Sequence, residues 1–88
     1  MVQTRHVAAS TNLDVMQRIF HPKAIAVVGA SATPGKLGYA IVSNLLSGGY
    51  QGRIYPVNPS GQEILGLKVH KSLEEVPEDL DVVVVSIP

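Results

Sequence analysis

The chain has 88 residues, which is enough for one domain with a modest core and excludes a two-domain enzyme within this sequence. With 45% hydrophobic and 16% charged residues, it is expected to fold rather than to stay disordered. Seven basic residues balance seven acidic ones, and this net charge of zero argues against general binding to nucleic acid or to an anionic membrane surface.

The sequence contains no cysteine, which excludes a disulfide framework, thiolate catalysis and a thiolate metal site. No apolar run approaches the roughly 20 residues of a membrane span. The segment from Met1 to Ser10 lacks the hydrophobic core of a secretory signal. We therefore expect a cytoplasmic protein with no membrane partner, in which residues 1–10 are a flexible tail and residues 11–88 form the domain.

The first predicted element is a short helix that Asn12 can cap. Its apolar stripe, expected to lie on the body of the domain, is formed by Leu13, Met16 and Phe20. The helix should end at His21-Pro22, because the residue before a proline is pushed out of the helical region.

The next segments predict a βαβ unit. The continuous apolar run Ala24–Val28 is typical of a parallel strand that is covered on both faces. After a glycine-bearing loop, a helical apolar face begins at Leu37 and stops at Gly48-Gly49. A second strand is predicted over Arg53–Val57, with Pro56 near its end.

Two further strands complete the predicted sheet. A short strand candidate covers Leu67–His70, and Ser72 with Glu75 spells a capping box for a brief helix. The strongly β-forming stretch Val82–Pro88 ends the chain. These elements predict an α/β fold, a Rossmann-like doubly wound parallel sheet with strand order 3-2-1-4. That order opens a crevice at the carboxyl ends of the first and fourth strands.

The loop after the first predicted strand has the chemistry to hold a phosphate. Free backbone N–H groups at the helix start would meet the anion together with the hydroxyls of Ser31 and Thr33 and the Lys36 ammonium. Gly35 lets the backbone approach closely. The structural alternative is that the glycines of this loop only make a turn and a close packing contact.

The identity of a phosphate ligand is left open by these residues. The dinucleotide fingerprint G-x-G-x-x-G is not met, because Ser31 stands where its second glycine would be, and no acid follows the second strand at Asn58. An NAD(P)-binding fragment of an oxidoreductase is therefore weakened but stays an alternative, as does a ligand-free regulatory or interaction domain. The spacing around Lys36 excludes a Walker P-loop.

Several ordered segments carry a resemblance to a known family: Phe20–Ser31, Pro34–Gly38, Gly52–Pro59, Ile64–Gly66 and Asp81–Pro88. Together they resemble the amino-terminal CoA-binding domain of the NDP-forming acyl-CoA synthetases. These include the ADP-forming acetate-CoA ligases and relatives of the succinyl-CoA synthetase alpha subunit. The resemblance covers nearly the whole chain.

The resemblance implies that coenzyme A binds by its nucleotide end across the crevice. The predicted contacts to its phosphates are Gly29, Ala30, Ser31, Thr33, Gly35 and Lys36. Those beside the adenosine are Val57, Asn58 and Pro59, and those along the adenine and pantetheine side are Ser86, Ile87 and Pro88. Relatives often carry a lysine just after the Asn-Pro step. Here that place is Ser60, so Lys36 or Arg53 would have to supply charge to the ribose 3′-phosphate.

The same resemblance implies that catalysis needs further synthetase domains or subunits, because the phosphorylated histidine of the family lies in a later domain. His6, His21 and His70 are interpreted as surface or capping histidines, so neither a catalytic residue nor a metal ligand is predicted. We also expect a fold that is incomplete after the fourth strand, as in a fragment. The exposed edge of Val82–Val85 would then favour self-association.

Overall fold

The structure is a computed structural model that describes residues 2–4 and 12–87 of the chain. Its regular elements alternate between strands and helices along the sequence. In chain order they are β1 (Val2–Thr4), α1 (Asn12–Phe20), β2 (Ala24–Val28), α2 (Leu37–Ser47), β3 (Arg53–Val57), a 3-10 turn (Leu73–Glu75) and β4 (Val82–Val85).

Three parallel strands form the centre of the domain, as the sequence predicts. β2 lies between β3 and β4 and runs parallel to both, with Ile25 opposite Ile54 on one side and Val82 on the other. Because β2 has a strand on each edge and is covered on both faces, its residues Ala24–Val27 are all buried. The α/β class with a parallel three-stranded sheet is confirmed.

The predicted third strand, Leu67–His70, contributes only an isolated bridge, in which His70 lies parallel to Val57. The start of this segment bonds instead to the turn that precedes it. Ile64 and Leu67 exchange two backbone hydrogen bonds of 3.1 and 2.8 Å around a tight turn. The sheet has the order β1-β4-β2-β3, so the predicted order 3-2-1-4 is not confirmed.

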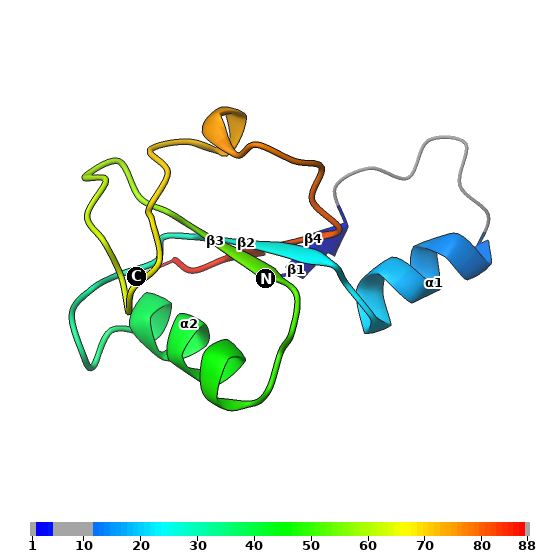
Figure 1. Ribbon diagram of the computed structural model, residues 1–88, viewed down its shortest axis with the longest axis horizontal. Helices are drawn as coiled ribbons and strands as arrows, with labels where there is room; N and C mark the ends of the chain where they lie inside the picture. Colours follow the sequence, from blue (N-terminus) through cyan, green and yellow to red (C-terminus); the bar gives the residue numbers. More distant parts are fainter. Residues whose placement is uncertain (1, 5–11, 88) are drawn as a thin grey trace.

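Each face of the sheet carries its own core (Figure 1). α2 covers one face, where Val42 packs with Val27 and Ile54. The segment around the 3-10 turn covers the other, where Leu80 packs with Ala26 and buried residues of β4. The loops that follow the three parallel strands gather at the carboxyl edge of the sheet.

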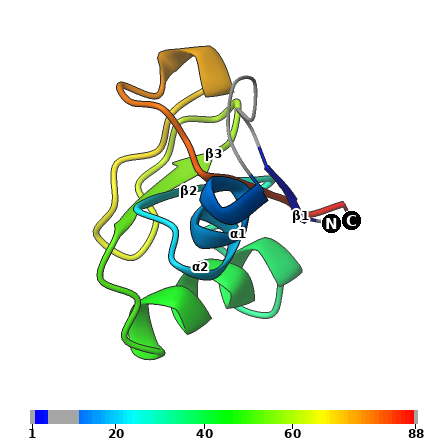
Figure 2. The same ribbon diagram turned by 90° about the vertical axis from the view of Figure 1, so that its right-hand side faces the viewer.

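α1 does not lie on the body of the domain, so the prediction for its apolar stripe is wrong. Leu13 is 67% exposed, Met16 53% and Phe20 68%. Figures 1 and 2 place α1 beyond the amino-terminal end of the sheet. Only residues 21–23 separate α1 from β2, which keeps the helix at that end, and both faces of the sheet are already covered.

The sequence predicts a tail at residues 1–10 and an open edge on β4, but β1 occupies that edge. It pairs antiparallel with β4, with Val2 opposite Val84 and Thr4 opposite Val82. The backbone groups of β4 that would invite another chain are thereby paired, which removes the reason to expect self-association there. Residues 5–11 of the expected tail lie outside the described residues.

The predicted brief helix is only a 3-10 turn. Its N-terminal residue Ser72 makes no side-chain capping hydrogen bond, so the predicted capping box does not form. The Glu75 N–H instead donates to the Ser72 carbonyl over 3.2 Å. None of the described helices is long and apolar enough to cross a membrane.

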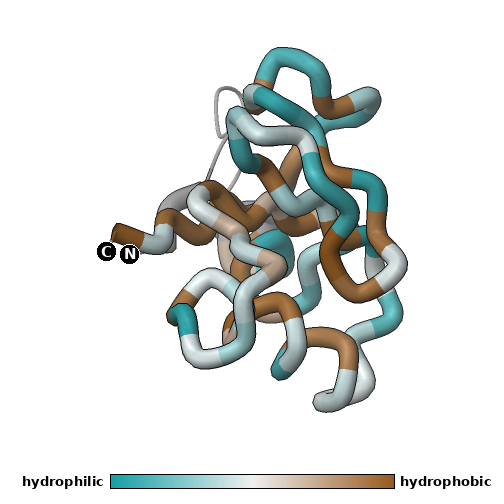
Figure 3. The backbone as a smooth tube through the Cα atoms, turned by 90° about the vertical axis from the view of Figure 1, so that its left-hand side faces the viewer, coloured by the Kyte–Doolittle hydropathy of each residue, from teal (hydrophilic) through white to brown (hydrophobic). Residues whose placement is uncertain are grey.

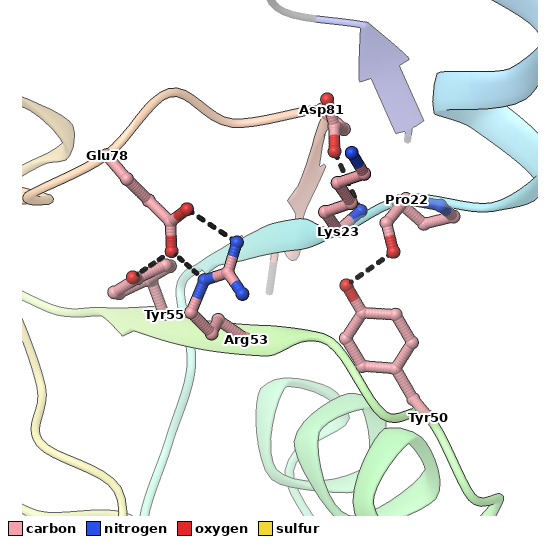
Figure 4. A network of polar contacts seen from close by, with 7 residues as sticks. All are labelled: Pro22, Lys23, Tyr50, Arg53, Tyr55, Glu78 and Asp81. Carbon is pink, nitrogen blue, oxygen red and sulfur yellow. Dashed lines mark hydrogen bonds and ion pairs between the residues drawn. The ribbon is translucent and has the colours of Figure 1, made fainter.

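A polar network joins β3 to the segment before β4 near the amino-terminal end of the sheet (Figure 4). Arg53 donates two hydrogen bonds to the Glu78 carboxylate, one from Nε and one of 2.8 Å from Nη2. The Tyr55 hydroxyl donates to the same carboxylate. These hydrogen bonds, from Arg53 first and Tyr55 second, lower the pKa of Glu78. The Glu78 carboxylate in turn raises the pKa of Arg53 and of Tyr55.

Replacing Glu78 by glutamine is expected to lower the free energy of unfolding slightly at about pH 7 and to change it little at about pH 3. Because folding lowers the pKa of Glu78, its contribution is present above the unfolded-state pKa and is lost as the pH falls through the folded-state pKa. Urea midpoints of both proteins at the two pH values measure this difference. Glu74→Gln, an exposed change in the 3-10 turn, is the control, and an equal loss at both pH values would contradict the prediction.

Candidate functional site

The loops that follow β2, β3 and β4 are tied to one another at the carboxyl edge of the sheet, which Figure 3 faces. The Gly29 N–H, just after β2, donates to the Val57 carbonyl at the end of β3 over 3.0 Å. On the other side, the Ser86 N–H after β4 donates to the Val28 carbonyl over 2.8 Å. The sequence predicts a crevice at this edge, and these bonds bring the predicted residues of all three strands together there.

Gly29 is the point where the chain leaves β2, and it requires glycine for two reasons. Its φ of +84° lies in the left-handed region, which residues with a Cβ rarely adopt. A Cβ at this position would also collide with the Ser86 carbonyl oxygen. On the helix side, a Cβ on Gly38 would collide with the Gly29 carbonyl, so α2 starts in direct contact with this turn.

The loop between Gly29 and α2 is closed by its own short hydrogen bonds. The Ser31 hydroxyl oxygen accepts a bond of 3.0 Å from the Thr33 N–H, and the Thr33 carbonyl accepts one of 3.2 Å from the Lys36 N–H. Thr33 and Lys36 are exposed, and a Cβ on Gly35 would meet nothing within 4 Å. The predicted phosphate-binding residues therefore form one compact loop that is open to solvent.

Within the described part of the chain, no side chain caps or neutralises the amino terminus of α2. Lys36 is the residue before the first helical turn and makes no side-chain capping bond, and no acidic residue occupies that turn. The first backbone N–H groups of a helix lack partners within the helix and carry a partial positive charge. An anion is the species that this end of α2 can bind best.

Asn58 joins the turn after β3 to the loop after β2. Its amide nitrogen Nδ2 donates to the buried Ala30 carbonyl over 2.8 Å, while its Oδ1 accepts from the Ser60 N–H over 2.9 Å. The side chain thus joins the loop after β2 to the turn after β3 and also supports that turn internally. Pro59 and Ser60, the next residues of the turn, are exposed.

His70 holds the same turn from its outer side. Its N–H donates to the Pro56 carbonyl over 3.0 Å, and its carbonyl accepts from the Asn58 N–H over 2.9 Å. The sequence predicts a surface or capping histidine, but Nδ1 of the ring is buried and has no hydrogen-bond partner among the described residues. The ring packs edge-on against Tyr55, with the two centroids 5.6 Å apart.

The end of β4 lies at the same edge, where the Ser86 N–H bonds to Val28. Ser86 is partly buried, and Ile87 is 68% exposed beside it. Pro88, the last predicted contact, lies outside the described residues. Except for Pro88, the structure therefore places all the predicted contact residues at this edge of the sheet.

The structure changes which basic side chains could supply charge to the ribose 3′-phosphate. The sequence predicts Arg53 as a source of charge for the 3′-phosphate. It lies at the amino-terminal end of β3, away from the carboxyl edge, and its guanidinium is bound by Glu78. Lys71 is a residue that the sequence did not single out. Its side chain lies against Gly61, where a Cβ would be 3.2 Å from the Lys71 Cε atom. Lys71 comes close to this turn because the preceding residue, His70, pairs with Val57.

A polar pocket of about 400 Å³ lies elsewhere, at the amino-terminal end of the sheet, and Arg18, Lys23 and Asp81 are among its lining residues. There the Lys23 N–H donates to Asp81 over 2.7 Å, and Arg18 lies 3.9 Å from the same carboxylate. The Asp81 carboxylate of this pocket is thus already engaged within the chain. Among the described residues, no group of acidic and histidine side chains could hold a metal ion.

Comparison with known protein families gives a match over residues 23–88 to a family described as a CoA-binding domain. Among curated proteins, the chain is 49% identical over 77 residues to the alpha subunit of the ADP-forming acetate–CoA ligase I of Pyrococcus furiosus. The match covers 83% of this chain and 17% of the relative, so this chain spans a small part of that protein's length.

Solved structures agree with this match. The dinucleotide-forming acetyl-coenzyme A synthetase 1 of Ca. Korarchaeum cryptofilum, solved with phosphate and ADP, superposes with a TM-score of 0.78 at 49% identity. It covers 83% of this chain, which corresponds to 16% of that chain. A hypothetical protein of Pyrococcus horikoshii OT3 matches 99% of this chain and 60% of its own length, with a TM-score of 0.70 and 34% identity.

Proposed function

Because this chain belongs to the CoA-binding domain family, we propose that it binds coenzyme A by the nucleotide end across the crevice at the carboxyl edge of β2, β3 and β4. We further propose that it does so as the amino-terminal CoA-binding part of an NDP-forming acyl-CoA synthetase of the acetate–CoA ligase type. The similarity to the Pyrococcus furiosus ligase subunit supports this second step.

The observation that carries the proposal is the way in which one loop is joined to two neighbouring strand ends. The loop after β2 is bonded to β3 through Gly29 and Val57, and again through Ala30 and Asn58. It contacts β4 through Gly29 and Ser86. In open α/β sheets, ligands bind outside the carboxyl ends of the strands at the point where the connections diverge to opposite sides.

The phosphates of CoA are assigned to the start of α2. Its first N–H groups and the exposed Lys36 ammonium offer positive charge, and Ser31 and Thr33 offer hydroxyl donors in the same loop. Gly35 leaves room for a phosphate to approach the backbone. This arrangement binds a diphosphate by charge and by main-chain donors together.

The adenosine and pantetheine parts are assigned to the two flanking walls. Val57, Asn58 and Pro59 would lie beside the adenosine, with the Asn58 side chain holding that wall to Ala30. Ser86, Ile87 and Pro88 would line the way along the adenine and pantetheine. The exposed apolar side chain of Ile87 is suited to that contact.

In this role the domain holds the acyl acceptor. The CoA thiol, as it loses its proton, would attack the carbonyl carbon of an acyl phosphate, forming the thioester and releasing phosphate, in a site that further domains or subunits complete. The residues at the carboxyl edge bind and orient the nucleotide end, and none of them is assigned a catalytic step. No described feature favours a nicotinamide dinucleotide, so NAD serves as the competing ligand in the test.

Replacing Lys36 by glutamate is expected to weaken CoA binding by about tenfold or more, because the change reverses the charge beside the phosphates. Isothermal titration of both proteins with CoA and with NAD measures the effect. The matched control is Lys68→Glu, the same charge reversal at another exposed lysine, which should leave the affinity unchanged.

The native chain should bind CoA more tightly than NAD. Absence of CoA binding, or equal affinity of the native and Lys36→Glu proteins, would refute the proposal. Hydrogen exchange gives an independent measurement, since CoA should protect the amides of residues 31–38. An interaction domain without a nucleotide ligand would show no such protection.

A further inference from the structure

Lys71 lies across the turn that follows β3. The preceding residue, His70, is bonded to Asn58 by a backbone hydrogen bond of 2.9 Å, which brings the two segments side by side. The aliphatic part of Lys71 then covers Gly61, whose Cβ position would be 3.2 Å from Cε and 3.5 Å from Cγ. The side chain thereby lies beside the turn formed by residues 58–61.

The ammonium of Lys71 is available to a ligand. Lys71 is exposed, and within residues 2–4 and 12–87 no hydrogen bond or ion pair occupies its side chain. Arg53, by contrast, is held by Glu78 at the start of β3. Lys36 lies in the other loop, at the start of α2, where the diphosphate is assigned.

The position of this turn determines which part of a nucleotide it would meet. In doubly wound sheets, the residues that follow the second strand lie beside the ribose: an acid there reads free hydroxyls, and a cation accommodates a phosphate on the ribose. β3 is the second strand of the βαβ unit, and Asn58 directly follows it. No acidic residue occurs in the turn of residues 58–61, whereas Lys71 lies against it.

We propose that Lys71 binds the 3′-phosphate on the ribose of CoA and so makes this domain prefer CoA over 3′-dephospho-CoA. This inference rests on the proposed CoA-binding function and adds the residue that recognises the phosphorylated ribose. Two separate lysines then bind the two phosphate groups of the nucleotide. Lys36, in the loop before α2, binds the diphosphate, and Lys71, beside the turn after β3, binds the 3′-phosphate.

Titration of the chain with CoA and with 3′-dephospho-CoA tests the inference. The native protein should bind CoA about fivefold to tenfold more tightly, the range for one partly exposed charge-assisted contact. In Lys71→Gln, the affinity for CoA should fall to that for 3′-dephospho-CoA, so that the ratio of the two affinities is lost, while the affinity for 3′-dephospho-CoA stays unchanged. Lys71→Arg should keep the ratio, because it keeps the charge, and Lys68→Gln is the control on the same segment.

The ratio should also shrink when the salt concentration rises from about 0.05 M to about 0.5 M, because mobile ions screen an exposed charge pair. If the native chain binds CoA but Lys71→Gln keeps the native ratio, the inference is wrong while CoA binding stands. If the native chain binds neither ligand, the proposed function itself fails. Thermal melting of each variant verifies that the fold is intact.

Discussion

Gly29→Ala is expected to destabilise the domain by about 2–5 kcal/mol, a large part of the stability of a small domain. The φ of +84° at Gly29 imposes backbone strain on any residue with a Cβ. The added methyl group would also collide with the carbonyl oxygen of Ser86, a residue whose own N–H donates to the Val28 carbonyl. Relief would require β2 and β4 to move apart at the edge where the ligand is proposed to bind.

Chemical unfolding of the native and Gly29→Ala proteins measures this loss. Gly35→Ala is the matched control, because Gly35 also has a positive φ, +93°, but a Cβ there would meet nothing within 4 Å. Its expected cost is only the backbone strain, about 1 kcal/mol. Equal losses for the two variants would show that the contact with Ser86 is not what makes Gly29 necessary.

Asn58→Ala is expected to destabilise the domain by about 1–3 kcal/mol, because the buried Ala30 carbonyl loses its donor. The same change removes the acceptor of the Ser60 N–H, so the turn after β3 also loses its internal support. CoA affinity should fall as well, since the turn after β3 and the loop after β2, where the ligand is proposed to bind, are no longer fixed relative to each other. Unfolding and titration, performed on the same variant, separate the two effects.

The control for Asn58→Ala is Asn44→Ala, which removes the same side chain from an exposed position in α2. Alanine is a better helix former than asparagine, so this change should leave stability equal or slightly higher. A loss at Asn44 as large as that at Asn58, or an unchanged CoA affinity in Asn58→Ala, would contradict the assigned role of Asn58.

The parallel core of this protein could be predicted because each piece of it is local in sequence. The continuous apolar run Ala24–Val28 predicts a strand that is covered on two sides, and the four valines Val82–Val85 predict a second strand through their high β-propensity. The glycine turn and the helix that follows it complete a βαβ unit. For the same reason, the predicted contact residues from Gly29 to Lys36 fall in one loop.

The third predicted strand and the apolar stripe of α1 could not be judged in this way. Leu67–His70 has strand-like composition, but its backbone bonds partly to its own turn at Ile64. The stripe of α1 is amphipathic by its spacing, yet Phe20 is 68% exposed because the sheet offers it no free face. The local sequence pattern indicates which side chains of a segment are apolar enough to be buried. It does not indicate whether the rest of the fold offers a surface that can cover them.

The amino-acid sequence by itself determined the α/β class, the glycine loop and its suitability for an anion, because these follow from periodicity and from backbone requirements within short segments. Only the tertiary structure decided that β1 covers the edge of β4, that Arg53 is held by Glu78 at the far end of β3, and that Lys71 reaches the turn after Asn58. Each of these depends on strand register and on the pairing of segments distant in the chain, and charge or composition at a single position does not encode that pairing.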